Sequence, residues 1–413
     1  MEAGQINIRN TYMPILRHIL ILLPFLMVIA SEILLYKQSS LSGPLKVGAV
    51  TYMLVYALLT LKYHGGLLFS ILCFLPFFIY AIIISFSLEA AIEESVRYLF
   101  PISILMYSYA LKKDFKFLLY SFLVFTLIND FWQIINYLNW MRGVRQWFYI
   151  YNPYWNTWGP NTTSGVLRAT GIVGFFGLFG FLNLIAFFLT KRFYHGKGKL
   201  VLMIIFLVSM FLSFSYKTLG TFLVLVFLEM KNKLRVLLYV MGIFVVAFLT
   251  MPQLVLTMEK NARYRLVEYV LEGNSARGDS YRVMFDEMGR LNLFGRGIGS
   301  FGGPSSVTYN SPVYKEVKFN WYTTPELTTT DTYYPHLFVE MGIIGGLLYM
   351  LIIVSPLIFL RWGYDKFKIV FVIYFALLFD ALFSYAINNI YYLILSLIFI
   401  YPIYYYDEKT KSP

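Results

Sequence analysis

A small set of ionisable side chains stands at the ends of long apolar runs or in the longest segment between such runs. The members of the set are Arg168, Lys217, Arg277, Arg282, Asp331 and His336. Ionisable groups beside apolar segments are costly to keep, so we treat them as candidates for function. A carboxylate or an imidazole can take a proton from a hydroxyl group, and guanidinium and ammonium groups can hold an anion. We expect these side chains to face one shared cavity.

Each of these side chains also has a structural explanation that the sequence leaves open. Arg168 can extend its side chain towards a polar surface, and Lys217, in a tight turn, can cap backbone carbonyls. His336 follows a proline and can be a buried, hydrogen-bonded histidine, while Asp331 can cap the helix after it. The two arginines of the longest segment can pair with nearby carboxylates, which are Glu272, Asp279 and Asp286.

A second candidate surface is the aromatic segment 139–167. Its aromatic side chains include Trp147, Tyr151, Trp155 and Trp158. One interpretation is an aromatic belt at a membrane interface. The other is a surface on which pyranose rings stack on flat aromatic faces while arginines meet acidic groups. Both interpretations can hold together, and the second makes these four residues candidate sugar-binding positions.

The elements that must position these residues are predicted to be membrane-spanning helices. The chain has 413 residues, of which 59% are hydrophobic and 14% are charged, whereas soluble domains carry roughly 25% charged residues. A spanning helix needs roughly 20 mainly apolar residues. About twelve runs qualify, namely 17–36, 45–61, 67–87, 98–111, 116–138, 168–190, 200–214, 218–230, 236–250, 335–360, 369–386 and 389–406. We therefore predict an all-α integral membrane protein, in which the two short runs 200–214 and 218–230 can form a hairpin that enters the membrane and returns.

The orientation follows from the distribution of lysine and arginine between the runs. Alternate gaps, starting with the N-terminus, are basic, among them 112–116, 191–199 and 231–235, whereas the gap around residues 89–94 is acidic. Basic loops stay in the cytoplasm, so both termini are predicted to be cytoplasmic. The net charge of +12 is explained by these scattered anchors, and we expect membrane lipids rather than nucleic acid as partners.

The runs divide the chain into five parts. These are the N-terminal helices (1–138), the aromatic outer loop (139–167), a second group of helices (168–250), a large outer loop (251–334), and the last helices with the tail (335–413). The large loop begins with an apolar stripe of helical spacing over 254–271, continues with a short helix from Ser280 to Leu291, turns at the glycines of 295–303 and is irregular over 305–330. A loop of this length is uncommon unless it is functional or disordered.

Several common kinds of site are not indicated. The single cysteine, Cys73, lies in an apolar run and forms neither a disulfide within the chain nor a zinc or redox motif. The glycines of 295–303 are not followed by the Lys-Ser or Lys-Thr of a nucleotide phosphate loop, and no paired aspartates for a metal-bound sugar nucleotide are present. We therefore predict neither a cofactor nor a metal, and a retained first apolar run rather than a signal peptide.

Four segments together resemble the O-antigen ligase and O-antigen polymerase superfamily. They are Arg168-Ala169-Thr170-Gly171; Ser213 to Lys217; Ser275-Ala276-Arg277 with Tyr281 and Phe294 to Phe301; and Asp331 to Tyr334 with Glu340 to Gly345. The resemblance covers residues 165–360. Where ligases of this family have a catalytic histidine, eleven residues before the first glycine of the Gly-Ile-Ile-Gly run, this chain has Asp331, which looks more like an O-antigen (Wzy-type) polymerase. Lys217 stands where members often have arginine, and the Pro-Asn that often follows Arg-x-x-Gly is absent.

The resemblance implies a membrane glycosyltransferase with a GT-C-like fold in the bacterial cytoplasmic (inner) membrane. Its substrates would be polyprenyl-pyrophosphate-linked oligosaccharides, polymerised on the extracytoplasmic face without a metal, with a chain-length regulator as a further partner. Asp331, or else His336, would be the general base. The pyrophosphate would be bound by Arg168, Lys217 and Arg277, with Arg282 behind them. The alternatives are a lipid-linked oligosaccharide flippase and an O-antigen ligase.

Overall fold

The structure is a computed structural model. It describes residues 8–36, 39–60, 63–143, 151–152, 157–158, 162–163, 166–229, 256, 260, 275–323, 329–330 and 332–407. The longer helices are α1 (Ile8–Tyr36), α2 (Ser42–Leu59), α3 (Gly65–Ile83), α4 (Leu88–Ala110), α5 (Phe115–Met141), α6 (Phe176–Phe193), α7 (Lys199–Leu212), α8 (Tyr216–Glu229), α11 (Ala276–Gly289), α14 (Tyr333–Phe359) and α15 (Tyr364–Phe383). The shorter helices are α12 (Pro304–Thr308), α13 (Val313–Glu316), η2 (Trp321–Thr323), η3 (Ala386–Asn388), α16 (Ile390–Leu397) and α17 (Ile400–Tyr405). Two hairpins of two-residue strands pair β1 (Tyr151–Asn152) with β2 (Thr157–Trp158) and β3 (Thr162–Thr163) with β4 (Val166–Leu167).

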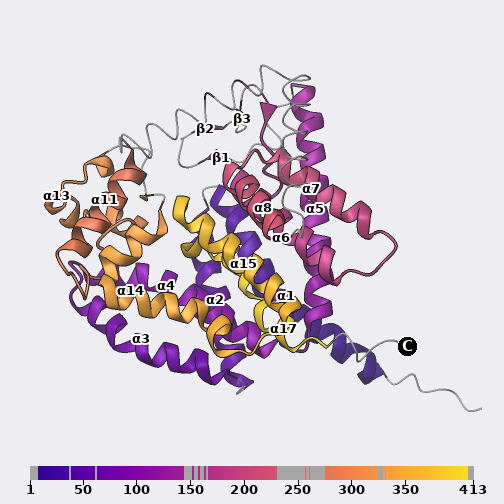
Figure 1. The fold of residues 1–413 in the computed structure, drawn as a ribbon, viewed down its shortest axis with the longest axis horizontal. Helices are drawn as coiled ribbons and strands as arrows, with labels where there is room; N and C mark the ends of the chain where they lie inside the picture. The colour runs from indigo at the N-terminus through magenta and orange to yellow at the C-terminus, as the bar shows by residue number, and fades with distance from the viewer. Residues whose placement is uncertain are drawn as a thin grey trace, which may run out of the picture.

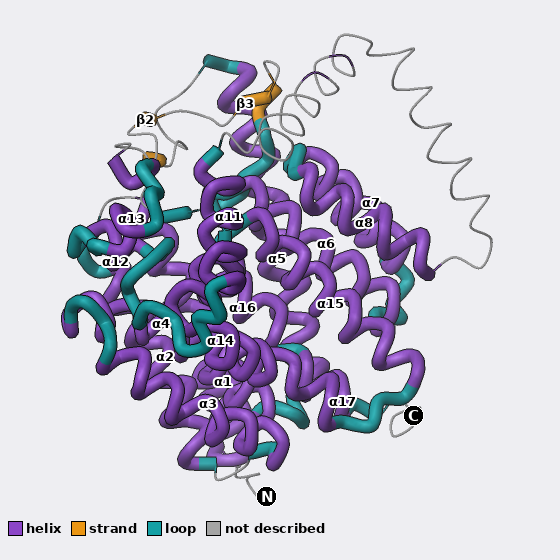
Figure 2. The backbone as a smooth tube through the Cα atoms, turned by 60° about the vertical axis from the view of Figure 1, so that its left-hand side comes forward, coloured by secondary structure: helices purple, strands orange, loops and turns teal. Residues whose placement is uncertain are grey.

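The helices form a bundle in which α15 is central. It packs against α14 as well as against α6 and α8, and in Figure 1 it lies between a group that contains α3, α4 and α14 and a group that contains α5 to α8. Loop segments gather around α11, α12 and α13 beside the bundle (Figure 2). This part has a small apolar core of its own, formed by Val283, Met284, Phe301, Val313, Tyr314, Val317, Phe319 and Val339.

The helical membrane-protein class is confirmed, while the number of spans stays a prediction. Within the described residues, six helices are long and apolar enough to cross a membrane: α1, α2, α3, α5, α6 and α14. The predicted spans 98–111 and 369–386 fall in α4 and α15, which also carry charged residues such as Glu94 and Asp380. α7 and α8 have 14 residues each, and the predicted span 236–250 lies outside the described residues.

The predicted span 168–190 was placed too early, because its first turns are not helical. α6 begins at Phe176, and the segment before it has two glycines with positive φ, Gly171 at +54° and Gly174 at +70°. A Cβ atom at Gly171 would lie 2.2 Å from Oδ1 of Asn129 on α5. Gly171 therefore permits both the turn and the close approach to α5, and Arg168 precedes the helix rather than opening it.

The large loop is partly as expected. The predicted helix from Ser280 to Leu291 is α11, which starts earlier because the Ser275 side chain caps it by accepting a hydrogen bond from the Gly278 N–H. The segment 305–330 was predicted to be irregular, but it contains most of α12 and all of α13 and η2. The amphipathic segment 254–271 lies outside the described residues except for residues 256 and 260.

α14 is a broken helix. Gly342 has φ +68° and ψ −176°, which interrupts the helical backbone. The carbonyls that the break frees at Val339 and Glu340 accept hydrogen bonds from the N–H groups of Arg296 (2.9 Å) and Gly297 (3.0 Å). On the other side of the break, the N–H groups of residues 343 and 344 donate to the carbonyls of residues 292 and 293 (3.2 and 3.1 Å). We call residues 292–305 the glycine loop. It thus satisfies the backbone groups of a broken membrane helix, as such helices require.

Candidate functional site

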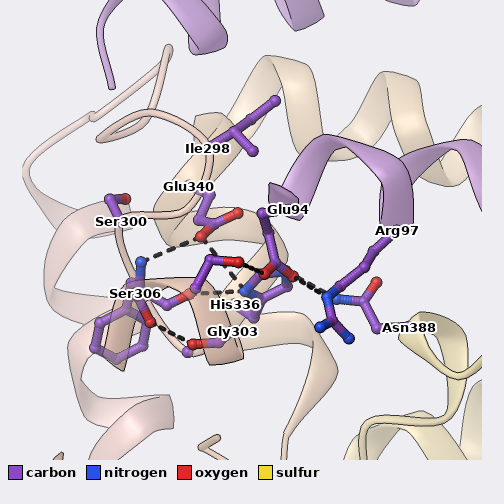
Figure 3. A network of polar contacts seen from close by, with 12 residues as sticks. Glu94, Arg97, Ile298, Ser300, Gly303, Ser306, His336, Glu340 and Asn388 are labelled. Carbon is purple, nitrogen blue, oxygen red and sulfur yellow. Dashed lines mark hydrogen bonds and ion pairs between the residues drawn. The ribbon is translucent and has the colours of Figure 1, made fainter. Parts of the chain in front are cut away.

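The candidate site is a buried polar network where α4 and α14 begin (Figure 3). Its centre is His336, three residues into α14, whose side chain is fully buried. Two carboxylates flank the imidazole: Glu94 Oε1 lies 3.6 Å from Nε2, and Glu340 Oε1 lies 3.6 Å from Nδ1. Asn388 of η3 completes the ring of contacts. Three segments that are distant in sequence, α4, α14 and η3, therefore meet at one histidine.

The hydrogen bonds of His336 define its tautomer. Nδ1 lies 2.7 Å from the carbonyl oxygen of Phe301, which can only accept, so Nδ1 carries the hydrogen. Nε2 lies 2.9 Å from the side-chain nitrogen of Asn388 and accepts from it. Both ring nitrogens are thus engaged in a side chain without solvent exposure. His336 can take a substrate proton only if Asn388 moves away, which disfavours the histidine as a direct base in this conformation.

Glu94 connects α4 to the glycine loop. Its Oε2 accepts a hydrogen bond from Ser305 (2.9 Å), and its Oε1 accepts one from the Tyr385 hydroxyl (3.4 Å). The guanidinium of Arg97, one turn further along α4, forms an ion pair with the same carboxylate (Nε to Oε1, 3.2 Å). The negative charge of this buried group is therefore compensated by one cation and two hydroxyl donors, as a buried charge requires.

Glu340 holds the other side of the histidine. Its Oε2 accepts a hydrogen bond from the Tyr98 hydroxyl (2.9 Å), and its Oε1 accepts one from the N–H of Phe301 (3.2 Å). The Tyr98 ring also lies parallel to the His336 ring, with centroids 5.9 Å apart. Glu340 thus anchors the glycine loop at the residue whose carbonyl orients the imidazole.

Two glycines let the loop come this close to the network. A Cβ atom at Gly303 would lie 2.7 Å from the carboxylate of Glu94, and one at Gly302 would lie 3.0 Å from Cβ of His336. Gly302 also has a positive φ of +80°. A larger residue at either position would displace the loop from the two charged helices.

The residues on either side of Asp331 are firmly placed, although Asp331 itself lies outside the described residues. The N–H of Thr330 donates to the carbonyl of Gly302 (3.1 Å). The hydroxyl of Thr332 lies 2.7 Å from the hydroxyl of Ser280, which donates to the carbonyl of Arg277. Thr330 thus contacts the glycine loop and Thr332 contacts α11, the helix that carries Arg277.

The segment 380–388 joins the network to two of the predicted cations. Lys217, at the start of α8, forms an ion pair with Asp380 (2.8 Å). The hydroxyl of Tyr281, four residues after Arg277 on α11, donates to the carbonyl of Leu382 (2.8 Å). Asn388 then reaches His336. The segments that carry Lys217 and Arg277 thus contact the end of α15, and His336 contacts the η3 turn that follows it.

Arg168 contacts two backbone carbonyls and an aromatic ring. Its Nε and Nη2 donate to the carbonyls of Ser213 (3.2 Å) and Phe214 (2.6 Å), and its guanidinium lies 3.1 Å from the centroid of the Phe176 ring. These contacts fix Arg168 at the turn between α7 and α8, close to Lys217, the second residue of α8. Lys217 in turn reaches Asp380 on α15, and the expectation of one cavity shared by all six side chains stays a prediction.

Arg282 belongs to the surface of the large loop. It pairs with Asp279 (2.6 Å) and Asp286 (2.9 Å) and also donates to the carbonyl of Val317 (3.2 Å). The pairing with Asp residues, which was the structural alternative, therefore holds for Arg282. A neighbouring pair joins Arg296 to Glu287 (2.8 Å).

The four aromatic positions are only partly described. Trp147 and Trp155 lie outside the described residues. Tyr151 and Trp158 are backbone partners in the β1–β2 hairpin, and a role of these residues in sugar binding stays a prediction.

The sequence analysis missed Glu94, Glu340, Asp380 and Asn388. A signal for three of them was present, because each is a carboxylate within or beside a long apolar run, where an ionisable group is expensive. Asn388 carries no such signal, because a single amide in a turn is common.

Comparison with protein-family models, with curated proteins and with solved structures found no match to this chain in any of the three. The resemblance to the O-antigen polymerases therefore rests on the four segments of the sequence alone.

Proposed function

We propose that the protein is a membrane glycosyltransferase that polymerises polyprenyl-pyrophosphate-linked oligosaccharide units into O-antigen or a related surface polysaccharide. The reaction takes place on the extracytoplasmic face. The growing chain is transferred from its lipid carrier to the non-reducing end of a new lipid-linked unit.

One observation carries this proposal. The two neighbours of Asp331 contact the glycine loop and the first turn of α11, and α11 carries Arg277. The residue after Asp331 thus contacts the helix that carries Arg277, more than fifty residues earlier in the sequence. Lys217 pairs with Asp380 on α15, and the end of α15 also contacts α11.

The chemistry follows from these residue types. A hydroxyl oxygen of the acceptor sugar bonds to the anomeric carbon of the donor, and the bond from that carbon to the diphosphate oxygen breaks. Asp331 takes the hydroxyl proton as general base, and polyprenyl diphosphate leaves. Arg277 and Lys217 bind the diphosphate and stabilise the charge that develops on it.

The histidine network has a supporting role in this proposal. His336 is buried and its ring nitrogens are both engaged, so it positions the glycine loop and the Thr330 end of the Asp331 segment rather than touching the acceptor. Glu94 and Glu340 hold the same loop from the two helices. In this proposal the network affects the rate of glycosyl transfer by positioning the general base, Asp331.

The test has a cellular part and a purified part. A strain without the protein should accumulate lipid-linked single repeat units. Purified full-length protein, given these units in detergent, should form polymer with release of polyprenyl diphosphate. If the strain accumulates no such units and the purified protein forms no polymer from them, the proposal is wrong.

A flippase for lipid-linked oligosaccharides is the second candidate, because broken helices such as α14 are frequent in transporters. In those proteins the break leaves backbone groups for a substrate or an ion. Here the groups beside Gly342 bond to residues 292–297 instead. Polymer formation in detergent, where there is no membrane to cross, would favour the enzyme over the flippase.

A further inference from the structure

The buried stripe of α5 changes from apolar to polar halfway along the helix. Its buried residues at spacings of three and four are Phe115, Leu119, Phe122, Thr126, Asn129, Gln133 and Asn136, with Asp130 beside them. The first three are apolar and the rest are polar. We call Thr126, Asn129, Asp130, Gln133 and Asn136 the α5 polar stripe. A helix that qualifies as a membrane span keeps five such residues only at a considerable cost.

Part of the α5 polar stripe holds the segment before α6. Oε1 of Gln133 accepts hydrogen bonds from the N–H groups of Thr170 (3.0 Å) and Gly171 (2.9 Å). Oδ1 of Asn129 accepts from the N–H of Ile172 (2.8 Å). These bonds satisfy a non-helical backbone segment inside the bundle. They use the amide oxygens of Gln133 and Asn129 and do not involve the amide nitrogens of these side chains.

Asp130 connects the stripe to α6. Its Oδ1 accepts a hydrogen bond from the side-chain nitrogen of Asn183 (3.0 Å). Asn183 is fully buried, and Asp130 is 6% exposed. The stripe and Asn183 thus face one another between α5 and α6.

Five buried polar atoms in this small region have no hydrogen bond of standard geometry among the described residues, although Ser209 lies close to Asp130 and Tyr137 close to Gln133. The five atoms are Nδ2 of Asn129, Oδ2 of Asp130, Nε2 of Gln133, Oδ1 of Asn136 and Oδ1 of Asn183. An unpartnered polar group away from water is costly, and native proteins keep few of them. Five together indicate a place that a polar ligand fills.

We propose that the α5 polar stripe and Asn183 bind one neutral sugar ring of the lipid-linked substrate. The five open atoms comprise two donors and three acceptors, and none of them belongs to a lysine or an arginine. A sugar hydroxyl both donates and accepts, so vicinal hydroxyls match this mixture, whereas a phosphate would find only two donors and a carboxylate. The identity of the ligand rests on the proposed function; the existence of a polar recess does not.

The recess lies next to a predicted phosphate-binding residue. The hydroxyl of Tyr137, one residue beyond the stripe, donates to the carbonyl of Leu167 (3.0 Å), and Leu167 precedes Arg168. The N–H of Ala169 donates to the carbonyl of Leu212 (2.8 Å) at the end of α7. A sugar held by the stripe would therefore lie near the turn between α7 and α8, which holds Arg168 and precedes Lys217, one of the two proposed diphosphate ligands.

Cysteine labelling of the full-length protein tests the recess. Because Cys73 is the single cysteine, a Cys73→Ser background carries no other thiol. In it, Asn136→Cys and Asn183→Cys should react with a charged, membrane-impermeant thiosulfonate. The control Leu119→Cys, in the apolar half of the same stripe, should react roughly tenfold more slowly or less, because apolar surroundings suppress the thiolate. Equal slow labelling at all three positions would overturn the recess.

Protection from labelling then tests the ligand. The probe is the glycolipid fraction from a strain that lacks the protein, compared with polyprenyl phosphate that carries no sugar. Slower labelling of Asn136→Cys and Asn183→Cys with the glycolipid alone supports the sugar site. Equal labelling with both probes means that the recess holds only water, and the sugar site is then wrong. Absence of single repeat units from that fraction would instead contradict the proposed function.

Discussion

The carboxylate of Glu94 and the imidazole of His336 lie beside one another in the buried network, with Oε1 3.6 Å from Nε2. The distance is too long for a hydrogen bond, and Asn388 takes the lone pair of the imidazole instead. Glu94 therefore acts mainly on Arg97 and on the glycine loop.

Replacement of Glu94 by glutamine should destabilise the protein. Glu94→Gln keeps an acceptor for Ser305 but removes the charge that faces Arg97, whose side chain is 26% exposed. We expect a loss of about 2 kcal/mol, seen as a lower Tm of the purified protein in detergent. Glu93→Gln is the matched control, because the adjacent residue is exposed and its replacement should leave Tm unchanged. An equal Tm for both variants would contradict the role given to Glu94.

Removal of the Arg277 side chain should stop polymer formation without a loss of protein. If the guanidinium stabilises the leaving diphosphate, Arg277→Ala should lower the polymerisation rate roughly a hundredfold or more. The control is Arg290→Ala, at the other end of α11, whose side chain is 68% exposed. Polymer length on gels and membrane levels on blots give the answer. Polymer of normal length in Arg277→Ala would remove this residue from the site.

Asp331 and His336 should respond differently to replacement. Asp331→Asn removes the proposed base and should lower the rate about 10²–10⁴-fold while Tm is unchanged. His336→Gln disturbs a buried, fully bonded side chain and should lower Tm together with the rate. Measuring both quantities on both variants separates the two roles. Full activity in Asp331→Asn would exclude it as the base.

An alanine at position 303 should weaken the attachment of the glycine loop. Its Cβ would lie 2.7 Å from the Glu94 carboxylate, and such overpacking costs about 1–3 kcal/mol. Gly289→Ala, where a Cβ meets no atom within 4 Å, should leave Tm the same or slightly higher. Thermal unfolding of the two variants compares them directly. A Tm equal to that of the wild type in Gly303→Ala would show that the loop is held elsewhere.

Acid should release the pair between Glu287 and Arg296. Burial of Glu287 alone would raise its pKa, but hydrogen bonds from Arg296 and Asn292 outweigh the burial and hold the pKa below its usual value of 4.5. The stabilisation is complete above that usual value and is lost as the pH falls through the lowered pKa of the folded protein. The Tm difference between wild type and Glu287→Gln should be constant at neutral pH and shrink below pH 4.5. A difference that does not change with pH would contradict this assignment.

Local patterns in the sequence were enough to predict most of the helices. The helix expected from Ser280 to Leu291 is present, but its start was missed because the Ser275 cap lies before the predicted range. The class of helical membrane protein follows from composition. The start of α6 could not be predicted, because Gly171 fits a contact with Asn129 that only the folded bundle creates.

The arrangement of the site depended on contacts that are remote in sequence. The position of Lys217 opposite Asp380 and the network around His336 both arise where separate helices meet. A sequence pattern can mark a carboxylate in an apolar run as costly, as for Glu94, but it does not say which cation compensates it. The break at Gly342 could not be predicted for the same reason, because the backbone groups that bond to it lie in a loop that precedes the helix.

The hydrogen bonds between the glycine loop and the backbone beside Gly342 have a consequence for biogenesis. The partners of the broken turn, residues 292–297, leave the ribosome before α14 does. Until they dock, the half-helices on either side of Gly342 have bare carbonyl and amide groups that lipid cannot satisfy. Maturation of this span is therefore coupled to the arrival of a segment from outside the bundle. Shortening residues 292–297 should therefore cause degradation of the newly made chain by quality-control proteases, rather than only lower the activity of the protein.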